Sequence, residues 1–498
     1  MTDPETSPRV VRRSPWRVVR RTILWLGGAA ILILVTIIVG AAVDARYRVP
    51  DLQIWHRYSP PSEIRASDID ARFTLADYLA REQLAFDEVR ANVEDTLPPG
   101  GPFVVNRYVR TSRSSPSRME RDFNRTFEVT PDTVRGGALL IHGLTDGPYS
   151  MRALAEQLRA EGFYSLALRM PGHGTVPAGL VTSTADDWNA AVRLGVRHVR
   201  ERIGPQLPLV LVGYSNGGAL VTRYTLDAIE EPALPKPSRL ILVSPMIGVS
   251  PLARLANVIS ALGVIPYFEK ARWLDVVPEY NPYKYNSFPA NAGRQTYLVT
   301  HELQERLERA ASDGKLAQFP PVLSFQSLVD ATVSTPATVN NLFDRLPPNH
   351  SELVLFDFNR HARLDPFIRP EDLALMGRMF EKRPRNYRIT VVTNLRPDTL
   401  DVCARDIAPG STTPVDEPLG LAWARDLFSL SHVALPFPED DPVYGSLASE
   451  VSNGPVALGL LSPRGERSVL TVPIEVLMRV SSNPFFPYLA RRVSEWTR

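Results

Sequence analysis

The pattern of apolar and polar positions divides the chain into an apolar run, a mixed segment and a long alternating region. Residues 22–43 carry no charge, residues 44–135 mix Pro, Arg and other polar positions, and short apolar runs recur from residue 136 onward. A helix over the first run would extend about 33 Å, enough to cross a bilayer. We therefore predict a basic tail (1–21), a transmembrane helix (22–43), a stalk or docking layer (44–135) and a globular domain (136–498).

The alternating region predicts a mostly parallel sheet covered by helices on both faces, because apolar runs of strand length alternate with stretches of helical periodicity. The predicted strands cover residues 138–141, 164–169, 209–213, 240–243, 322–329, 353–358 and 389–392, and the predicted helices cover 151–161, 188–202 and 217–228. Between the predicted strands 240–243 and 322–329, the alternation gives way to short helical stretches with aromatic residues that look exposed. This break predicts an inserted cap over about 251–320. A long insertion is predicted over about 359–425, and an amphipathic helix over 74–93.

Charges on either side of the apolar run predict its orientation. Six arginines precede it and Asp44 follows it: Arg9, Arg12, Arg13, Arg17, Arg20 and Arg21. The positive-inside bias places the tail in the cytoplasm and the large domain outside. The excess of Arg over Lys suggests a bacterial genome, hence an inner membrane with the domain on its periplasmic side. A cleaved signal peptide ending at Gly40-Ala41-Ala42 is the alternative, whereas a buried core helix would need covering on every side.

Composition narrows the classes of function. The formal net charge is +2, and the basic residues beyond the tail are scattered, so we expect no nucleic-acid partner. Cys403 is the only cysteine, so no internal disulfide can form, and we expect a bystander thiol. The oligomeric state does not follow from the sequence.

The strongest chemical signal is Gly213-Tyr214-Ser215-Asn216-Gly217. A Gly-x-Ser-x-Gly motif alone is common, but this one joins a predicted strand to a predicted helix. A sharp turn at that point holds the serine hydroxyl clear of the sheet, and the two glycines leave room for the backbone. We predict that Ser215 is a nucleophile. The alternative is a Gly-rich turn in which Ser215 caps the helix.

Three sequence blocks resemble the lipase and serine-aminopeptidase branch of the α/β-hydrolases, close to monoacylglycerol lipases and bacterial carboxylesterases. They read His142-Gly-Leu-Thr-Asp-Gly-Pro-Tyr-Ser, Arg169-Met-Pro-Gly-His-Gly-Thr and Gly213-Tyr-Ser-Asn-Gly-Gly. The resemblance covers about residues 135–335. It implies an α/β-hydrolase fold, a cap between strands six and seven, a triad in the order Ser, Asp, His, and small acyl esters or acylglycerols as substrates. It also implies a structural role for His173.

Acyl transfer at a serine needs preorganised donors for the oxyanion, usually backbone N–H groups from two loops. Asn216 follows the nucleophile and supplies the first N–H. In the fold that the resemblance implies, the second donor lies after the third strand, and we assign it to Leu144. The neighbouring His142 is expected to shape this loop rather than to titrate.

A triad also needs an imidazole base and a carboxylate that orients it. Asp330 ends the apolar run before Thr332, at the expected tip of strand seven; its alternative role is to cap the helix that begins near Pro336. Three candidate histidines follow Asp330 in the chain. His350 precedes the next predicted strand and is set aside, so two histidines remain as candidates for the base.

His361 stands directly after a predicted strand, where the simplest version of the fold would place the base, but its arginine neighbours disfavour an imidazolium. His432 lies later in the chain, between apolar flanks that suit a buried, oriented imidazole. We favour His432, which requires the long insertion before it, and keep His361 as the alternative.

These features predict a membrane-anchored serine hydrolase of carboxylic esters, with acylglycerols, lysolipids or other acyl esters as substrates. We expect no cofactor and no metal. Its partners are then a small-molecule or lipid ester and the membrane that holds the N-terminal helix. An acyltransferase or a peptidase on the same core is the enzymatic alternative, and a non-catalytic anchored scaffold is the alternative from another class.

Overall fold

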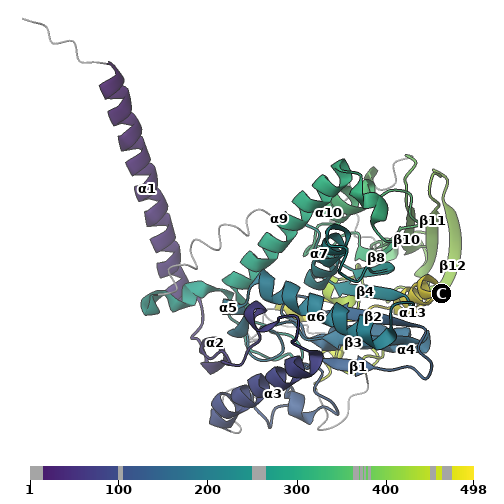
Figure 1. The fold of residues 1–498 in the computed structure, drawn as a ribbon, viewed down its shortest axis with the longest axis horizontal. Helices are drawn as coiled ribbons and strands as arrows, with labels where there is room; N and C mark the ends of the chain where they lie inside the picture. Colours follow the sequence, from purple (N-terminus) through teal and green to yellow (C-terminus); the bar gives the residue numbers. More distant parts are fainter. Residues whose placement is uncertain are drawn as a thin grey trace, which may run out of the picture.

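A ten-stranded sheet forms the centre of the protein in the computed structural model, in the order β1-β3-β2-β4-β5-β8-β9-β10-β11-β12 (Figure 1). The structure describes residues 15–98, 105–248, 265–362, 383–448, 456–461 and 474–498, with residues 370, 374, 377 and 378. The strands are β1 Phe127–Val129, β2 Gly136–Ile141, β3 Phe163–Leu168, β4 Leu209–Tyr214, β5 Arg239–Val243, β8 Val322–Ser327, β9 Glu352–Phe356, β10 Arg388–Asn394, β11 Asp401–Ile407 and β12 Val415–Ala422. Strands β3 to β10 in this order run parallel, and β1, β11 and β12 are antiparallel at the edges. The predicted, mostly parallel sheet is confirmed.

Helices cover both faces of this sheet, which explains why its central strands are apolar along their whole length. One face carries α6 (Ala185–Ile203), α7 (Asn216–Glu230) and α9 (Ala290–Ser312), and the other carries α4 (Arg152–Ala160) and α13 (Phe486–Thr497). Helix α9 lies inside the range predicted as a cap, and it packs against α7 in the helix layer. Residues 251–264 of that range lie outside the described residues.

The range predicted as a long insertion contains three strands of the sheet. Strands β10, β11 and β12 extend the sheet beyond β9, and the buried Cys403 lies on β11. The chain then returns toward the centre and forms the short helix η13 (His432–Ala434). Residues 363–369 and most of 371–382 of this range lie outside the described residues.

Residues 54–98 and 105–126, which we call the N-terminal layer, pack against the sheet domain. Helix α2 (Ile54–Arg57) and helix α3 (Leu75–Asn92) belong to it. Helix α3 confirms the predicted amphipathic helix, and it begins at a capping box in which Thr74 and Asp77 bind each other's backbone N–H. Trp55 and Tyr108 of the layer join a small apolar cluster with Val176 of the sheet domain.

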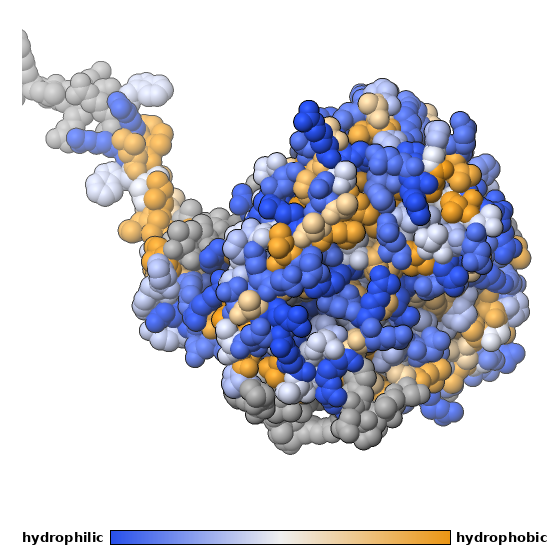
Figure 2. Space-filling model, turned by 60° about the horizontal axis from the view of Figure 1, so that its bottom comes forward, coloured by the Kyte–Doolittle hydropathy of each residue, from blue (hydrophilic) through white to orange (hydrophobic). Residues whose placement is uncertain are grey.

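Helix α1 (Pro15–Arg48) projects from the body of the protein as a long rod (Figure 1). Its window Val19–Gly40 is long and apolar enough to cross a bilayer, and it is not buried against the rest of the chain; among the described residues no other helix meets this test. Figure 2 shows the rod as largely apolar next to a body of mixed polarity. A membrane anchor and a signal sequence share these properties. The predicted tail arginines Arg9, Arg12 and Arg13 lie outside the described residues.

Candidate active site

Ser215 occupies a strained turn between β4 and α7. Its backbone has φ 54° and ψ −118°, a left-handed conformation that costs a non-glycine residue about 1–3 kcal/mol. Hydrogen bonds from the neighbouring strand connection hold this conformation: the Ser215 N–H donates to Val243 O at 2.9 Å, and its carbonyl accepts the Gly218 and Met246 N–H groups at 2.9 Å each. The turn therefore raises the serine above the carboxyl edge of the sheet.

The glycines of the motif are required by close backbone contacts. A Cβ atom on Gly217 would lie 2.1 Å from the carbonyl oxygen of Ile141, and one on Gly213 would lie 2.5 Å from that of Gly217. Both distances are too short for any side chain, and the opposing atoms belong to the backbone. Glycine at both positions therefore allows strand β2, the turn at Ser215 and helix α7 to approach each other this closely.

The loop after β2 passes directly beside Ser215. A Cβ atom on Gly143 would lie 3.1 Å from the Cβ of Ser215. Within the part of the chain that the structure describes, neither the Leu144 N–H nor the Asn216 N–H has a hydrogen-bond acceptor. The two predicted oxyanion donors therefore lie on separate segments, Leu144 in the loop after β2 and Asn216 at the start of α7, and neither N–H is bound to an acceptor there.

Asp330 and His432 lie in contact. Nδ1 of His432 donates to Oδ2 of Asp330 at 3.1 Å, while Oδ1 accepts the N–H groups of Thr332 and Val333 at 2.8 and 3.0 Å. Burial raises the pKa of Asp330, but the bonds from His432, Val333 and Thr332 outweigh burial, so the pKa lies below its ordinary value. Because Nδ1 carries the proton toward Asp330, Nε2 of His432 is the nitrogen that can accept one.

The imidazole of His432 is almost fully buried and stacks on Tyr214, the residue before Ser215, with ring centroids 5.3 Å apart. This stacking places the Asp330–His432 pair next to the strained turn. By contrast, no hydrogen bond or ion pair among the described residues joins Asp330 to His350 or to His361 on η11 (Arg360–Ala362). The structure thus joins His432 to Asp330, and it places the imidazole against Tyr214, the neighbour of Ser215.

A cavity of about 190 Å³ opens beside Tyr214 and the residue after His432. Its lining includes six apolar residues: Val433, Phe437, Leu458, Leu461, Val476 and Leu477. The lining also contains the buried Asp146, whose carboxylate lies 3.9 Å from Lys284. Burial raises the pKa of Asp146, and the nearby Lys284 only partly opposes this. The burial of Asp146 could not be predicted from the sequence, because a charged residue in a loop is usually solvated.

The histidines of the family blocks are structural neighbours of the site. His142 is buried and accepts the Met170 N–H at 3.0 Å, and His173 packs against it with ring centroids 5.0 Å apart. Neither contacts Ser215 or Asp330 in the described contacts. No group of three His, Cys, Asp or Glu side chains in the described ranges is arranged to hold a metal ion.

Comparison with known proteins relates this chain to lipolytic enzymes. The model of the serine aminopeptidase S33 family matches residues 132–365. A thermostable monoacylglycerol lipase of Bacillus sp. (strain H-257) is 26% identical over 237 residues, which cover 46% of this chain and 84% of the relative.

Two solved structures are also similar in part. One comes from a study of the metagenome-derived lipolytic enzymes LipS and LipT, with 23% identity, TM-score 0.36, and 52% of this chain and 96% of that chain covered. The other is the Paleococcus ferrophilus monoacylglycerol lipase, with 20% identity, TM-score 0.35, and coverage of 47% and 89%. The family match includes Ser215, Asp330 and His361, but ends before His432.

Proposed function

We propose that this chain is a membrane-anchored serine hydrolase of carboxylic esters whose triad is Ser215, His432 and Asp330. The match of residues 132–365 to the serine aminopeptidase S33 family and the similarity to a monoacylglycerol lipase support this proposal. The observation that carries the proposal is the hydrogen bond between Nδ1 of His432 and Asp330, next to the strained turn at Ser215. A nucleophile, a base and an orienting carboxylate in this arrangement are what acyl transfer requires.

In the proposed reaction, the Ser215 hydroxyl attacks the ester carbonyl while its proton passes to Nε2 of His432. The Leu144 and Asn216 N–H groups stabilise the oxyanion, and Asp330 stabilises the imidazolium. Collapse of the tetrahedral intermediate breaks the bond to the alcohol, which takes the proton from His432. Water then attacks the acyl-serine with the same base, and the acid and the free serine are released.

The apolar residues that line the cavity support an acyl ester with a hydrocarbon part as substrate. Together with the relative named as a monoacylglycerol lipase, they favour acylglycerols and lysolipids. A series of p-nitrophenyl esters of increasing chain length, set beside monoacylglycerols, lysophospholipids and aminoacyl p-nitroanilides, tests this choice. Preferred release of p-nitroaniline would favour a peptidase, and product esters formed with added alcohols would favour an acyltransferase.

We further propose that α1 is a transmembrane anchor that holds the enzyme on the periplasmic side of a bacterial inner membrane. Arg17, Arg20 and Arg21 lie at its N-terminal end, which favours a cytoplasmic tail. At its other end, Arg46 donates to the carbonyl oxygen of Tyr267 at 3.1 Å and lies over that ring. Protease added to intact spheroplasts should therefore degrade the domain; protection of the domain would contradict this orientation.

A fluorophosphonate probe provides the direct test of the nucleophile. The wild-type protein should be labelled, and Ser215→Ala should abolish the labelling without loss of folding. A folded wild-type protein that remains unlabelled would contradict the proposed function and favour a non-catalytic anchored domain.

A further inference from the structure

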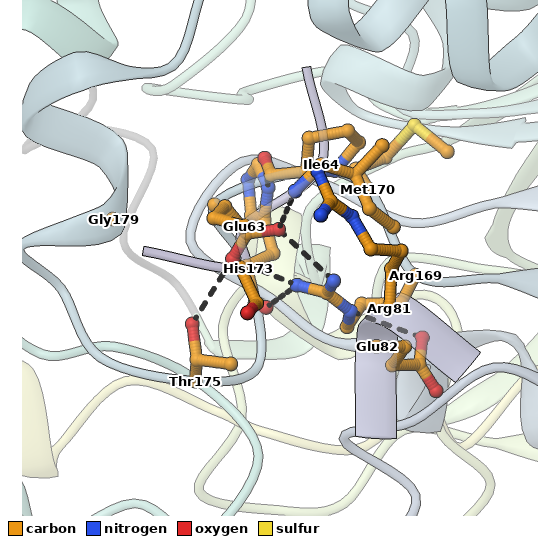
Figure 3. Close-up of polar contacts among 12 residues, drawn as sticks. Glu63, Ile64, Arg81, Glu82, Arg169, Met170, His173, Thr175 and Gly179 are labelled. Atoms are coloured by element: carbon orange, nitrogen blue, oxygen red, sulfur yellow. Dashed lines mark hydrogen bonds and ion pairs between the residues drawn. The ribbon is translucent and has the colours of Figure 1, made fainter. Parts of the chain in front are cut away.

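The guanidinium of Arg169, the residue after β3, is fully buried and donates four hydrogen bonds (Figure 3). Nη1 and Nη2 donate to the two carboxylate oxygens of Glu63 at 3.2 and 3.0 Å, and Nε donates to Glu82 at 3.0 Å. Nη1 also donates to the carbonyl oxygen of His173 at 2.8 Å. Buried ionised groups are stable only when they are paired and hydrogen-bonded, so these three side chains depend on one another.

Both carboxylates come from the N-terminal layer, outside the segment that the family model matches. Glu63 follows α2, and Glu82 lies on α3. The layer also binds the backbone of Arg169: the hydroxyl of Tyr78 donates to its carbonyl oxygen, and Oγ1 of Thr126 accepts its N–H at 3.0 Å. The layer thus fixes the side chain, the N–H and the carbonyl of one residue of the sheet domain.

His142 connects Arg169 to the loop beside the nucleophile. The N–H of Met170, the next residue, donates to Nε2 of His142 at 3.0 Å, so Nδ1 carries the proton and donates to Gly143 O at 2.8 Å. Burial lowers the pKa of His142 well below its ordinary value, so the ring stays neutral and Nε2 remains an acceptor. The position of residues 142–144 therefore depends on the backbone that Arg169 anchors.

We propose that Arg169 is a positioning residue for the reaction: held by Glu63 and Glu82, it fixes the loop that presents the Leu144 N–H beside the nucleophile. This inference rests on the proposed function. Its consequence is that the N-terminal layer is a working part of the active site and not only a spacer between the anchor and the enzyme.

The inference predicts a specific kinetic effect, because an oxyanion donor works only at 2.7–3.1 Å from the developing charge. A displaced loop leaves ground-state binding largely intact but weakens binding of the tetrahedral state. Loss of one complete donor lowers kcat by about 10²–10³, so a shifted donor should lower it by about 10-fold. KM should change by less than about twofold, because the lost interaction belongs to the transition state.

Glu63→Gln and Glu82→Gln in the full-length protein provide the test, since glutamine keeps the volume and removes the charge. Each variant should lower kcat for p-nitrophenyl butyrate about 10-fold, and the inhibition constant of a trifluoromethyl ketone, which forms a tetrahedral adduct, should rise by the same factor. Tyr78→Phe removes one hydrogen bond to Arg169 without burying an unpaired charge. It should lower kcat about threefold, so it tests the inference even where a glutamine variant fails to fold.

Glu352→Gln is the matched control. Glu352 is a buried carboxylate paired with Arg492, at the opposite edge of the sheet from Ser215. This variant should lower the thermal midpoint but leave kcat and the inhibition constant unchanged. The inference would be overturned if Glu63→Gln, Glu82→Gln and Tyr78→Phe all kept the wild-type kcat and inhibition constant. It would also be overturned if Glu352→Gln lost as much kcat as these variants. Either result would leave the proposed function intact. A wild-type protein that hydrolyses no ester would overturn the proposed function and this inference with it.

Discussion

Asp330→Asn should inactivate the enzyme by reversing the tautomer of His432. In the wild type, Oδ1 of Asp330 accepts two backbone N–H groups, from Thr332 and Val333, and Oδ2 accepts Nδ1–H. Asparagine has one acceptor oxygen and one NH₂ group. The two backbone donors hold its oxygen at the Oδ1 position, so the NH₂ group faces Nδ1. The imidazole must then carry its proton on Nε2, where it cannot accept the proton of Ser215.

The size of the effect follows from this geometry. In serine-protease triads the wrong tautomer lowers kcat by about 10⁴, which corresponds to about 5 kcal/mol in the activation free energy. The free energy of unfolding should fall by only about 1–2 kcal/mol, because the two backbone hydrogen bonds remain and a charged acceptor is replaced by a neutral group. Activity should therefore disappear in a protein that still folds.

The assay is kcat and KM for p-nitrophenyl butyrate, together with a thermal melt of each purified variant. Asp357→Asn is the control, because Asp357 is also a buried carboxylate directly after a strand at the same edge of the sheet. It accepts the hydroxyl of Thr393 at 2.7 Å and pairs with Arg360. This control should keep kcat within about threefold of the wild type. An Asp330→Asn variant that retains more than about a tenth of wild-type kcat would refute the tautomer mechanism.

Three further predictions test other parts of the account. Gly217→Ala places a methyl group 2.1 Å from Ile141 O, so a urea titration should show a free energy of unfolding that is lower by about 3 kcal/mol. An unchanged midpoint would contradict the contact. Burial lowers the pKa of His173 to about 3. The contribution of this neutral side chain to the free energy of unfolding is therefore present above pH 6.5 and is lost as the pH falls toward 3. Between pH 7 and pH 5 the loss should be about 2 kcal/mol. In His173→Gln, the loss of unfolding free energy between pH 7 and pH 5 should be smaller by that amount. A loss equal to that of the wild type would refute the burial of His173 in its neutral form. The double substitution Leu32→Arg with Ile33→Arg in α1 should make the free energy of membrane insertion less favourable by about 6 kcal/mol. It should therefore release an active esterase from membranes. Retention of the variant in the membrane pellet would contradict the proposed anchor.

The parallel strands were predictable because a strand that is buried on both faces consists of consecutive apolar residues, as in β2 and β4. Helix α3 was predictable from its periodicity, and its capping box agrees with the same boundary. Strands β11 and β12 gave no such signal, because they lie at an edge and most of β12 is exposed. A strand whose side chains face water carries no apolar pattern, so the sequence suggested an insertion where the sheet continues.

The candidate site was predictable where chemistry and local pattern coincide, as at Ser215. The apolar flanks of His432 indicated a buried imidazole, and the structure brings it to Asp330. The burial of Asp146 and Arg169 could not be predicted in the same way. Each is a charged residue whose partners lie far along the chain, and a buried ion pair leaves no periodic pattern in the sequence.

The central claim is that Ser215 acts with His432, a base supplied from beyond the family-matched segment. The most direct test compares His432→Ala with His361→Ala in the rate of ester hydrolysis and of fluorophosphonate labelling at Ser215. We expect His432→Ala to lower kcat/KM by at least about 10³ and His361→Ala to remain close to the wild type. Full activity in His432→Ala together with inactive His361→Ala would contradict the account.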